Sequence, residues 1–318
     1  MSLYYEPCSR ITVGNATFEH VNKVAITESV KELGDKAIVT LPRNYKKLEG
    51  KSILDIIAVG DKVTIELGTD GNYHTEFTGY LAEITSDAPM VLTIDDNFYP
   101  LKRNSFVKAW EKVSLKELLN YVAAGLTIHA PEINLGAFQI NNVSTYRVLR
   151  ALQEQYGFYS YIRNGELFCQ FAYDVRGIGN KLTYKIGNNV KKNDLKFHRE
   201  GDVKIKIKAI ANQRTGKKLV YETGSTDPDA SLRTLNFGDV TLSQLKELAE
   251  KTYSKLSFDG YTGSITGFAY PRTHAADTLQ IIDEQEPERD GNYLIESVVI
   301  NYSLTGGFER INTLSFKV

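Results

Sequence analysis

Cysteine, tryptophan and proline are all scarce in this chain of 318 residues, which contains two, one and eight of them. The two cysteines, Cys8 and Cys169, lie far apart and have neither a metal-binding nor a redox spacing, so we expect free thiols. No apolar run approaches the ~18 residues that a membrane-spanning helix needs. The first residues, Met1 to Glu6, lack the basic and apolar regions of a signal peptide. We therefore expect a soluble protein that is made in the cytoplasm and does not insert into a membrane.

An excess of either charge is also missing, because 38 basic and 39 acidic residues leave a formal charge of −1. Bulk electrostatic attraction to nucleic acid or to anionic membranes is therefore excluded as a default role. With 42% hydrophobic and 24% charged residues, the composition is that of a globular protein. At about 150 residues per domain, the length predicts two or three domains. Tyrosine is unusually common, with 19 copies, and suits half-buried strand faces and interfaces.

The motifs of common catalytic and metal sites are absent from the sequence. There is no Gly-x-Ser-x-Gly motif and no phosphate-binding Gly-Lys-Thr loop, and Gly177-Ile-Gly179 is too short to cradle a phosphate. The histidines are scattered and include no His-x-x-x-His or His-Glu-x-x-His pair, so no zinc site is predicted. We accordingly predict no catalytic residue, no cofactor-binding residue, no metal ligand and no cofactor. The five histidines are His20, His74, His129, His198 and His274.

Two carboxylate groups and one thiol are the remaining candidates for chemistry. Asp95-Asp96 and the pair Glu284 and Glu286 are the only tight carboxylate groups outside predicted helices. Two carboxylates across a cleft could hydrolyse a glycoside, but we favour the interpretation that these are exposed acids in turns. Cys169 lies in a predicted strand, and we expect a buried structural residue rather than a nucleophile.

Lysines and tyrosines on predicted strands offer two possible binding surfaces. Lys204, Lys206 and Lys208 alternate along one strand and share a face that could hold an anion or a strand of DNA. We favour a solvated face, since lysines also block unwanted pairing of strand edges. Four tyrosines could stack on sugars, but cross-strand packing is the favoured interpretation. These are the tyrosines at positions 159, 161, 293 and 302.

Residues 1 to about 104 are predicted to form a first β-domain. The segment from Gly60 to Leu67 alternates apolar and charged residues, which is typical of a half-buried strand. Asp70-Gly71 then provides a turn. The regular turns and alternating strands favour a small barrel or sandwich. The predicted strands are Ile11–Val13, Phe18–Ile26, Ala37–Leu41, Val63–Leu67, Phe77–Ser86 and Met90–Ile94.

Residues 105–178 mix helix and strand. Ser114 and Glu117 form a capping box for a helix that ends at Gly125. A second helix is predicted over Thr145–Tyr156, stopped by Gly157. The Asn164-Gly165 pair between two apolar strands is a strong signal for a tight hairpin. The sequence therefore predicts an α/β segment between two strand-rich parts.

Residues 179–318 are predicted to form a second β-domain. Thr241 and Gln244 form a capping box for a helix over residues 241–256. Four strands follow, and we interpret Thr241–Val318 as one unit made of a helix and an antiparallel meander. The strands are Gly263–Gly267, Thr278–Ile282, Tyr293–Tyr302 and Ile311–Phe316.

A short repeated sequence pattern, which we call the echo, relates the two β-domains. Asp61–Ile65 and Asp277–Ile281 share the pattern Asp-x-aliphatic-x-Ile in its essentials, and each is followed at a similar distance by Tyr-Leu-x-Glu, at Tyr80 and at Tyr293. Each echo ends in a closing strand. The predicted fold is therefore mainly β with an α+β insert, in which two similar small β-barrel domains are separated by an α/β segment.

This order of elements resembles the baseplate hub proteins of contractile-tailed phages, the late control D family. That family includes the tail hubs of Mu-like phages and prophages and is related to the N-terminal part of type VI secretion spike proteins. The resemblance is strongest from the helix at 241–256 through Gly263–Gly267 to Gly291-Asn-Tyr293, and the hairpin around Asn164-Gly165 also fits. One departure is His274-Ala-Ala-Asp277, where the family often has Pro-Gly before the strand.

The resemblance implies a structural protein of the virion and not an enzyme. It implies a homotrimer, whose two β-domains per chain would form a ring of six similar domains between the tail tube protein and the central spike protein. Strand edges left open in one subunit would pair across subunits. The ring would assemble in the bacterial host cytoplasm, would end in the virion tail baseplate, and would make only passing contact with DNA in its channel.

Two other classes of function are compatible with the residues alone. A monomeric carbohydrate-binding or adhesin-like β protein would present an aromatic-lined groove. A phage cell-wall hydrolase would need a cleft that holds a carboxylate pair with a raised pKa. The three alternatives differ in oligomeric state and in what the concave surfaces contain.

Overall fold

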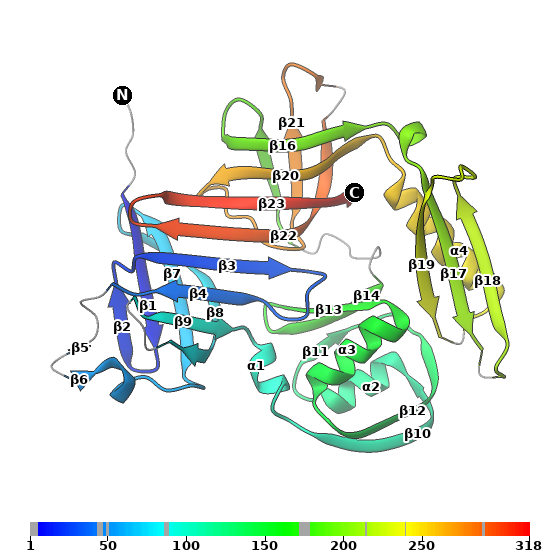
Figure 1. Cartoon of the computed structure of the whole chain (residues 1–318), viewed down its shortest axis with the longest axis horizontal. Coiled ribbons are helices and arrows are strands. Elements are labelled where there is room, and N and C mark those ends of the chain that lie inside the picture. The colour runs from blue at the N-terminus through cyan, green and yellow to red at the C-terminus, as the bar shows by residue number, and fades with distance from the viewer. Residues whose placement is uncertain are drawn as a thin grey trace.

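The computed structural model describes residues 6–42, 47–48, 51–85, 89–171, 179–213, 215–238, 240–287 and 290–318. About 54% of the protein is strand and 16% is helix, which confirms the prediction of a mainly β fold. Helices among the described residues are all too short or too polar to cross a membrane. Four bodies can be distinguished in Figure 1: two β modules, a middle segment and an outlying unit.

The first β module is an antiparallel sheet in the order β3-β4-β9-β8-β7-β1-β2. The turn between β7 and β8 is the predicted Asp70-Gly71, with both residues at positive φ (53° and 78°). The expected strand Phe18–Ile26 is in fact two strands, because the chain turns at His20, whose φ is 54°. The strands are β1 (Pro7–Val13), β2 (Ala16–Glu19), β3 (Lys23–Ser29), β4 (Lys36–Thr40), β5 (Lys47–Leu48), β6 (Lys51–Ser52), β7 (Lys62–Thr69), β8 (Asn72–Ile84) and β9 (Val91–Asp95), with a 3₁₀ turn at Ile53–Asp55.

The second β module repeats this arrangement in the order β16-β20-β23-β22-β21-β15. Its meander β21-β22-β23 corresponds to β7-β8-β9, although β15 runs parallel to β21 whereas β1 runs antiparallel to β7. The strands are β15 (Lys181–Lys185), β16 (Val190–His198), β20 (Gly260–Phe268), β21 (Thr278–Ile282), β22 (Gly291–Ser303) and β23 (Gly307–Lys317).

Strands β3 and β22 join the two modules into one sheet of thirteen strands (Figure 1). Strand β21 pairs with β22 only as far as Leu294, so the rest of that edge is free for β3, from Ser297 opposite Ser29 to Ser303 opposite Lys23. One cluster of buried apolar side chains runs through both modules. The expectation of two separate barrels needs correction, because no sheet in the described ranges closes on itself and the two modules share a sheet and a core.

The middle segment packs three helices against two small sheets. The predicted hairpin is present, with Asn164 and Gly165 both at positive φ between β13 and β14. The predicted helix ends at Gly157, whose φ is 71°. A long strand that we did not predict, β10, pairs with β12. The elements are α1 (Phe98–Leu101), β10 (Phe106–Ser114), α2 (Leu115–Val122), β11 (Thr127–His129), β12 (Asn134–Val143), α3 (Thr145–Tyr156), β13 (Phe158–Arg163) and β14 (Glu166–Phe171).

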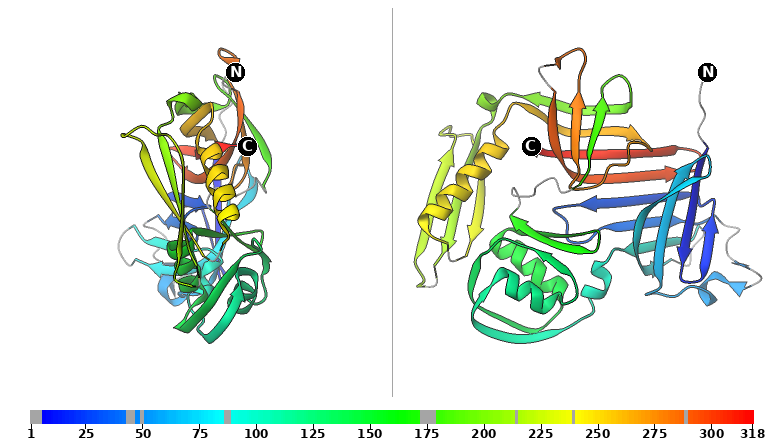
Figure 2. Two further views of the ribbon diagram at one scale, coloured as in Figure 1. Left: turned by 90° about the vertical axis from the view of Figure 1, so that its right-hand side faces the viewer. Right: turned by 180° about the vertical axis from the view of Figure 1, so that it is seen from behind.

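The outlying unit is a three-stranded sheet covered on one face by a helix (Figure 2). Its elements, after a 3₁₀ turn at Glu200–Asp202, are β17 (Ile205–Asn212), β18 (Lys218–Gly224), β19 (Ser231–Phe237) and α4 (Leu242–Leu256). Helix α4 begins with the predicted capping box of Thr241 and Gln244. It does not form one unit with the C-terminal meander as expected, because Leu245 and Ala249 pack with the side chains of β17.

Candidate functional site: a repeated turn and the ionic joint around it

The same turn precedes the meander in both β modules. The backbone N–H of Leu81 donates to Asp61 O (2.9 Å), and Gly60 N–H donates to Leu81 O (2.8 Å). In the second module Ile295 N–H donates to Asp277 O (2.9 Å), and Ala276 N–H donates to Ile295 O (2.9 Å). Both modules also have a β-bulge directly after this position, between Leu81 and Glu83 and between Ile295 and Ser297. The hydrogen bonds and the bulge together mark a structural repeat.

The repeat is offset by one residue from the echo in the sequence. The hydrogen bonds make Leu81 equivalent to Ile295, so Tyr80 corresponds to Leu294 and not to Tyr293. A shift of one residue moves a side chain to the other face of a sheet. Consistent with this, Tyr293 is completely buried whereas Tyr80 is only half-buried. The matching Tyr-Leu letters therefore identified the correct strands in the wrong register.

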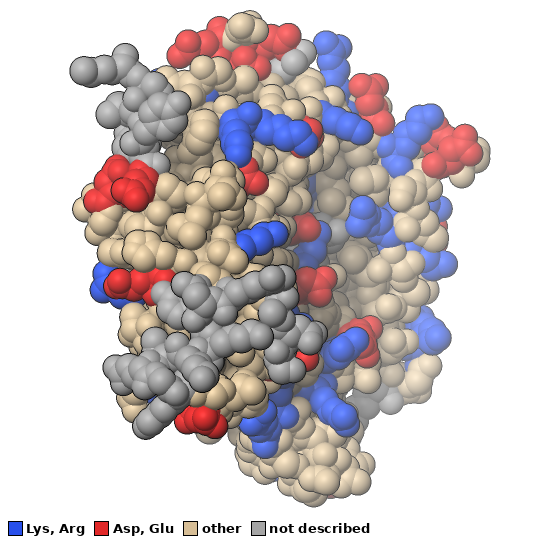
Figure 3. All heavy atoms as spheres, turned by 60° about the vertical axis from the view of Figure 1, so that its left-hand side comes forward, with Lys and Arg blue, Asp and Glu red and all other residues tan. Residues whose placement is uncertain are grey.

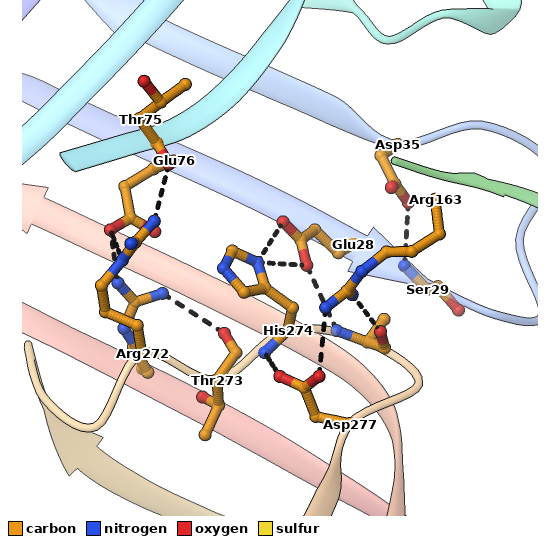
Figure 4. A network of polar contacts seen from close by, with 12 residues as sticks. Glu28, Ser29, Asp35, Thr75, Glu76, Arg163, Arg272, Thr273, His274 and Asp277 are labelled. Atoms are coloured by element: carbon orange, nitrogen blue, oxygen red, sulfur yellow. Dashed lines mark hydrogen bonds and ion pairs between the residues drawn. The ribbon is translucent and has the colours of Figure 1, made fainter. Parts of the chain in front are cut away.

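The turn of the second module, residues 274–277, is bound by the hairpin of the middle segment. Arg163, the last residue of β13, donates through Nη2 to Oδ1 of Asp277 (3.1 Å) and through Nη1 to the backbone oxygen of Ala275 (Figure 4). Asp277 also accepts from the backbone N–H of Asn180 at 2.9 Å. Its side chain is fully buried and that of Arg163 is 20% exposed. The hairpin is thus tied to the second module by a buried, charge-assisted pair.

The first module binds the same turn through Glu28, near the end of β3. Both oxygens of Glu28 lie near Nδ1 of His274, at 3.0 and 3.1 Å, and Oε2 also accepts from Ala275 N–H at 3.2 Å. Glu28 and Arg163 therefore hold the 274–277 turn from two different bodies of the protein (Figure 4). We call this cluster, made of Glu28, Arg163, His274 and Asp277, the ionic joint.

A second set of ion pairs ties the modules together beside the joint. Glu76 of β8 accepts from Nε of Arg272 at 2.9 Å and lies 2.7 Å from Nη2 of Arg310 in β23. Arg310 is fully buried, and its Nε donates to the backbone oxygen of Ala269 (2.8 Å). Removing one partner of a buried pair leaves an uncompensated charge, which costs about 3–5 kcal/mol. Glu76 is therefore essential to the packing of the second module although it belongs to the first.

A cavity of about 600 Å³ lies where the three bodies meet, and Glu28, Asp35, Glu76, Asp96 and Arg163 are among its lining residues. Asp95 and Asp96 contradict the prediction of exposed acids in a turn, because they are only 9% and 7% exposed. Asp95 pairs with Lys102 at 2.6 Å, while Asp96 accepts at 2.9 Å from the backbone N–H of Phe98, the first residue of α1. Helix α1 packs these acids inward, which the run of letters did not indicate.

The carboxyl groups around the cavity differ in how readily they lose a proton. Burial raises the pKa of Asp96 to about 6. Burial, and then the nearby charges of Glu28 and Asp96, raise the pKa of Asp35 well above its usual value. Burial also opposes ionisation of Glu28, but the charges and hydrogen bonds of His274, Arg163 and Ala275 prevail and lower its pKa. Glu28 is thus the ionised member of the group, and its two neighbours resist ionisation.

The histidines are not brought together. His274 belongs to the ionic joint and His129 pairs with Glu166 at 2.9 Å. His74 contacts Tyr270, His198 contacts Phe258, and His20 occupies a turn. In the part of the chain that the structure describes, no three His, Cys, Asp or Glu residues are placed to hold a metal ion.

The remaining candidates have structural surroundings. Cys169 is completely buried in β14, and burial raises the pKa of its thiol to about 12, so the reactive thiolate is suppressed. The lysine face of β17 is matched by acids, with Lys206 2.7 Å and Lys208 3.5 Å from Glu222. In the second acid pair, Glu284 is exposed and Glu286 is half-buried, and Gly177 lies outside the described residues.

Among the four tyrosines, Tyr161, Tyr293 and Tyr302 are buried, and Tyr161 stacks on its cross-strand neighbour Phe168 with ring centres 5.2 Å apart. Tyr159 is half-buried. None of the three buried rings is available to a sugar. Figure 3 shows one face of the molecule, on which basic and acidic side chains are interspersed with neutral surface.

Sequence reasoning missed most of the ionic joint and the ion pairs beside it. Glu28, Glu76, Arg163 and Arg272 come from strands and loops that are far apart in the chain, and no spacing connects them. Two signals were available: Asp277 opens the second half of the echo, and Arg163 directly precedes the Asn-Gly turn. Neither signal identifies a partner, because the pairing depends on the modules being side by side.

Comparisons with known proteins relate the chain to tail proteins by structure alone, since neither a family model nor a curated protein matches the sequence. A tail protein from Neisseria meningitidis MC58 is similar with a TM-score of 0.65 and 15% identity, covering 99% of this chain and 97% of that one. The 43 kDa tail protein of prophage MuSo2 from Shewanella oneidensis is similar with a TM-score of 0.63 and 15% identity, covering 97% and 98%. An Escherichia coli component of the type VI secretion system, c3393, gives 0.62 and 7%, covering 96% and 76%. The resemblance inferred from the sequence is confirmed at the level of the fold.

Proposed function

We propose that this chain is the structural baseplate hub of a phage or prophage contractile tail. In this role it forms a homotrimer, a ring of six similar modules that joins the tail tube protein to the central spike protein. The proposal includes assembly in the bacterial cytoplasm, residence in the tail baseplate, and division of the chain near residues 104 and 178 into two β-domains around an α/β domain. It includes no enzymatic activity, no cofactor and only passing contact with DNA.

The observation that carries the proposal is the pairing of β3 with β22. It shows how one β module binds the next: an outer strand, β3, lies along the free edge of the central strand of the following module. The side chains that this pairing buries include Val24, Ile26, Val298 and Ile300, none of which is measurably exposed. Each buried side chain of this size contributes about 1.5–3 kcal/mol. The pairing of β3 with β22 is therefore a stable interface and a template for interfaces between modules of different copies.

The two surfaces that form this template each occur once more among the described residues without a strand paired to them. The second module has an outer strand of this kind, and the first module has a strand edge of this kind. Strand β16 occupies the place in the second module that β3 occupies in the first, and among the described residues it pairs only with β20. The stretch Glu83–Thr85, which includes the end of β8 and the residue after it, occupies the place of Ser297–Val299 of β22, and β7 does not extend along it. Unpaired strand edges of this kind bind further strands unless they are blocked.

The registers define which residues would meet. Thr27 lies opposite Val299 in the observed pairing of β3 with β22. Through the matched ladders of the two modules, Lys196 is the equivalent of Thr27, and through the repeated turn Thr85 is the equivalent of Val299. Lys196 of one copy is therefore expected opposite Thr85 of the next. A contact between two different surfaces makes a closed ring or an open filament, depending on the rotation per step.

Disulfide cross-linking of a Lys196→Cys, Thr85→Cys double variant tests this arrangement. Directly opposed residues in antiparallel strands have Cβ atoms about 4.5–5.5 Å apart, close enough to cross-link. We expect covalent trimers under oxidising conditions, and a trimer mass by light scattering before oxidation. The native thiols do not compete because Cys8 and Cys169 are buried.

The matched control is Lys196→Cys with Thr78→Cys. Thr78 is exposed on β8 and lies seven residues before Thr85, which is roughly 23 Å along a β-strand. We expect no cross-linked trimer from this variant. Monomers that never cross-link at high concentration, or an open ladder of ever longer chains, would contradict the trimeric ring.

A further inference from the structure

We propose that the ionic joint is a proton-sensitive latch, which holds the two β modules and the β13–β14 hairpin together more tightly at about pH 5.5 than at about pH 7.5. This inference concerns one chain and does not depend on the ring or on a role in a tail.

The joint is a meeting point of three bodies and not an interior packing detail. Arg163 comes from the middle segment, Glu28 from the first module, and His274, Ala275 and Asp277 from the second. Beside these polar contacts, Tyr161 and Phe168 of the hairpin pack against Ala275 and Ala276 of the turn. A change of charge at the turn therefore changes the contact of each body with the other two.

The charges at this point are unbalanced. The first module contributes the carboxyl groups of Glu28, Asp35 and Asp96, and the second contributes Asp277. Arg163 is the one guanidinium within the joint, and it is already paired with Asp277. Arg272 and Arg310 lie nearby but are paired with Glu76. Lys102 is paired with Asp95. When all four carboxyl groups are ionised, they repel one another around a single fixed positive charge.

Protonation of Asp35 and Asp96 removes this repulsion. Asp35 and Asp96 retain protons more readily than ordinary aspartates, because they are buried. Burial opposes the ionisation of Glu28, but the charges and hydrogen bonds of His274, Arg163 and Ala275 lower its pKa, so Glu28 stays ionised. Because Asp35 and Asp96 become neutral as the pH falls, they no longer repel Glu28, and Glu28 holds the 274–277 turn more tightly. The cavity beside the joint gives the protons a route from solvent and leaves room for the carboxyl groups to separate when the pH rises.

Hydrogen exchange of the full chain, followed by mass spectrometry at the two pH values, tests the latch. After correction for the intrinsic dependence of exchange on pH, we expect peptides covering residues 272–280 and 158–168 to be about fourfold better protected at the lower pH. The titration of Asp96 alone, from a pKa of about 6, supplies a factor of this size. Equal protection at the two pH values would overturn the proposal.

A double variant, Asp35→Asn with Asp96→Asn, separates the latch from general effects of pH. Each asparagine keeps the oxygen that accepts from Ser29 or Phe98 N–H. We expect strong protection at both pH values, because the repelling charges are gone. Asp229→Asn is the control, since Asp229 is exposed in a different body of the protein, and it should respond to pH as the wild type does. A double variant that responds to pH like this control would contradict the proposal.

If the double variant does not fold, as judged by circular dichroism, Glu28→Gln provides an independent test. Glutamine keeps an acceptor for Ala275 N–H but removes the charge that both Asp35 and His274 act on. We expect weaker protection of residues 272–280 at both pH values and a smaller difference between them. A full pH response in Glu28→Gln would show that the response arises elsewhere and would overturn the latch.

Discussion

Asp61 and Asp277 make the same hydrogen bond in two parts of the chain. Each accepts, through Oδ2 and at 2.8 Å, from the backbone N–H three residues earlier, that of Ala58 in the first module and that of His274 in the second. Only Asp277 has a second task, because Oδ1 binds Arg163 and Asn180. One copy of the repeated turn has thus become the anchor for a neighbouring body, while the other remains a local turn.

The two aspartates should therefore differ in their effect on stability. Asp61→Ala removes a partly exposed capping bond and should cost about 1 kcal/mol. Asp277→Ala also leaves Arg163 without its carboxylate partner at a buried site and should cost about 3–5 kcal/mol. Urea denaturation of both variants, with Asp229→Ala as an exposed control, measures the difference. Equal losses of unfolding free energy would show that the second task of Asp277 contributes nothing.

The pair of Glu76 and Arg310 should behave as a coupled unit. Arg310→Met leaves a buried carboxylate with one remaining partner, Arg272, and should lower the unfolding free energy by about 3–5 kcal/mol. Replacing both residues, with Glu76→Gln and Arg310→Met, should cost less than the sum of the two single changes. A double-mutant cycle in urea measures this coupling. Additive losses would contradict the view that these two charges depend on each other.

Stability should depend on pH through the acids of the cavity. Burial raises the pKa of Asp96 to about 6 in the folded protein from the usual 3.8, so between these values the folded state holds more protons than the unfolded state. The stability that protonation provides is present at pH 5 and is lost as the pH rises through about 6. Asp96 alone should make the protein about 1 kcal/mol more stable at pH 5 than at pH 7. Thermal unfolding of Asp96→Asn, in which the difference should shrink, checks this; an unchanged difference would assign it to other groups.

Local patterns in the sequence predicted the elements well and their assembly poorly. The capping box at Thr241, the stop at Gly157 and the Asn164-Gly165 turn all depend on interactions within a few residues, and all three are present. The path of α4 could not be predicted in this way, because its apolar face fits the sheet of the outlying unit as well as it would fit the meander that follows it. Amphipathic spacing predicts that one face of a helix is buried, but it does not predict which element covers that face.

The echo shows the same limit at the level of the fold. It identified the two meanders, yet it aligned Tyr80 with Tyr293, and the hydrogen bonds of Leu81 and Ile295 require the neighbouring register. Short identities between strands arise because each face of a strand requires buried or exposed residue types. Other residues can meet the same requirement when the register is shifted by one. The ionic joint was beyond reach for a related reason: Glu28 and His274 are 246 residues apart, and only the pairing of β3 with β22 brings them together.

The substitution Gly179→Ala tests whether the 274–277 turn requires the close approach of residue 179. Gly179 has no positive φ, so its lack of a side chain is not required by its backbone conformation; instead, a Cβ at this position would lie 1.8 Å from Oδ1 of Asp277. That oxygen binds both Arg163 and Asn180 N–H, so Gly179→Ala should displace it and lower the unfolding free energy by about 1–3 kcal/mol. Gly201→Ala is the matched control, because Gly201 also lacks a positive φ and no atom lies within 4 Å of its Cβ position. The control should be neutral or slightly stabilising. If both alanines have the same effect in urea, the close approach of residue 179 does not determine the position of Asp277, and its hydrogen bonds with Arg163, Asn180 and His274 are sufficient to hold it.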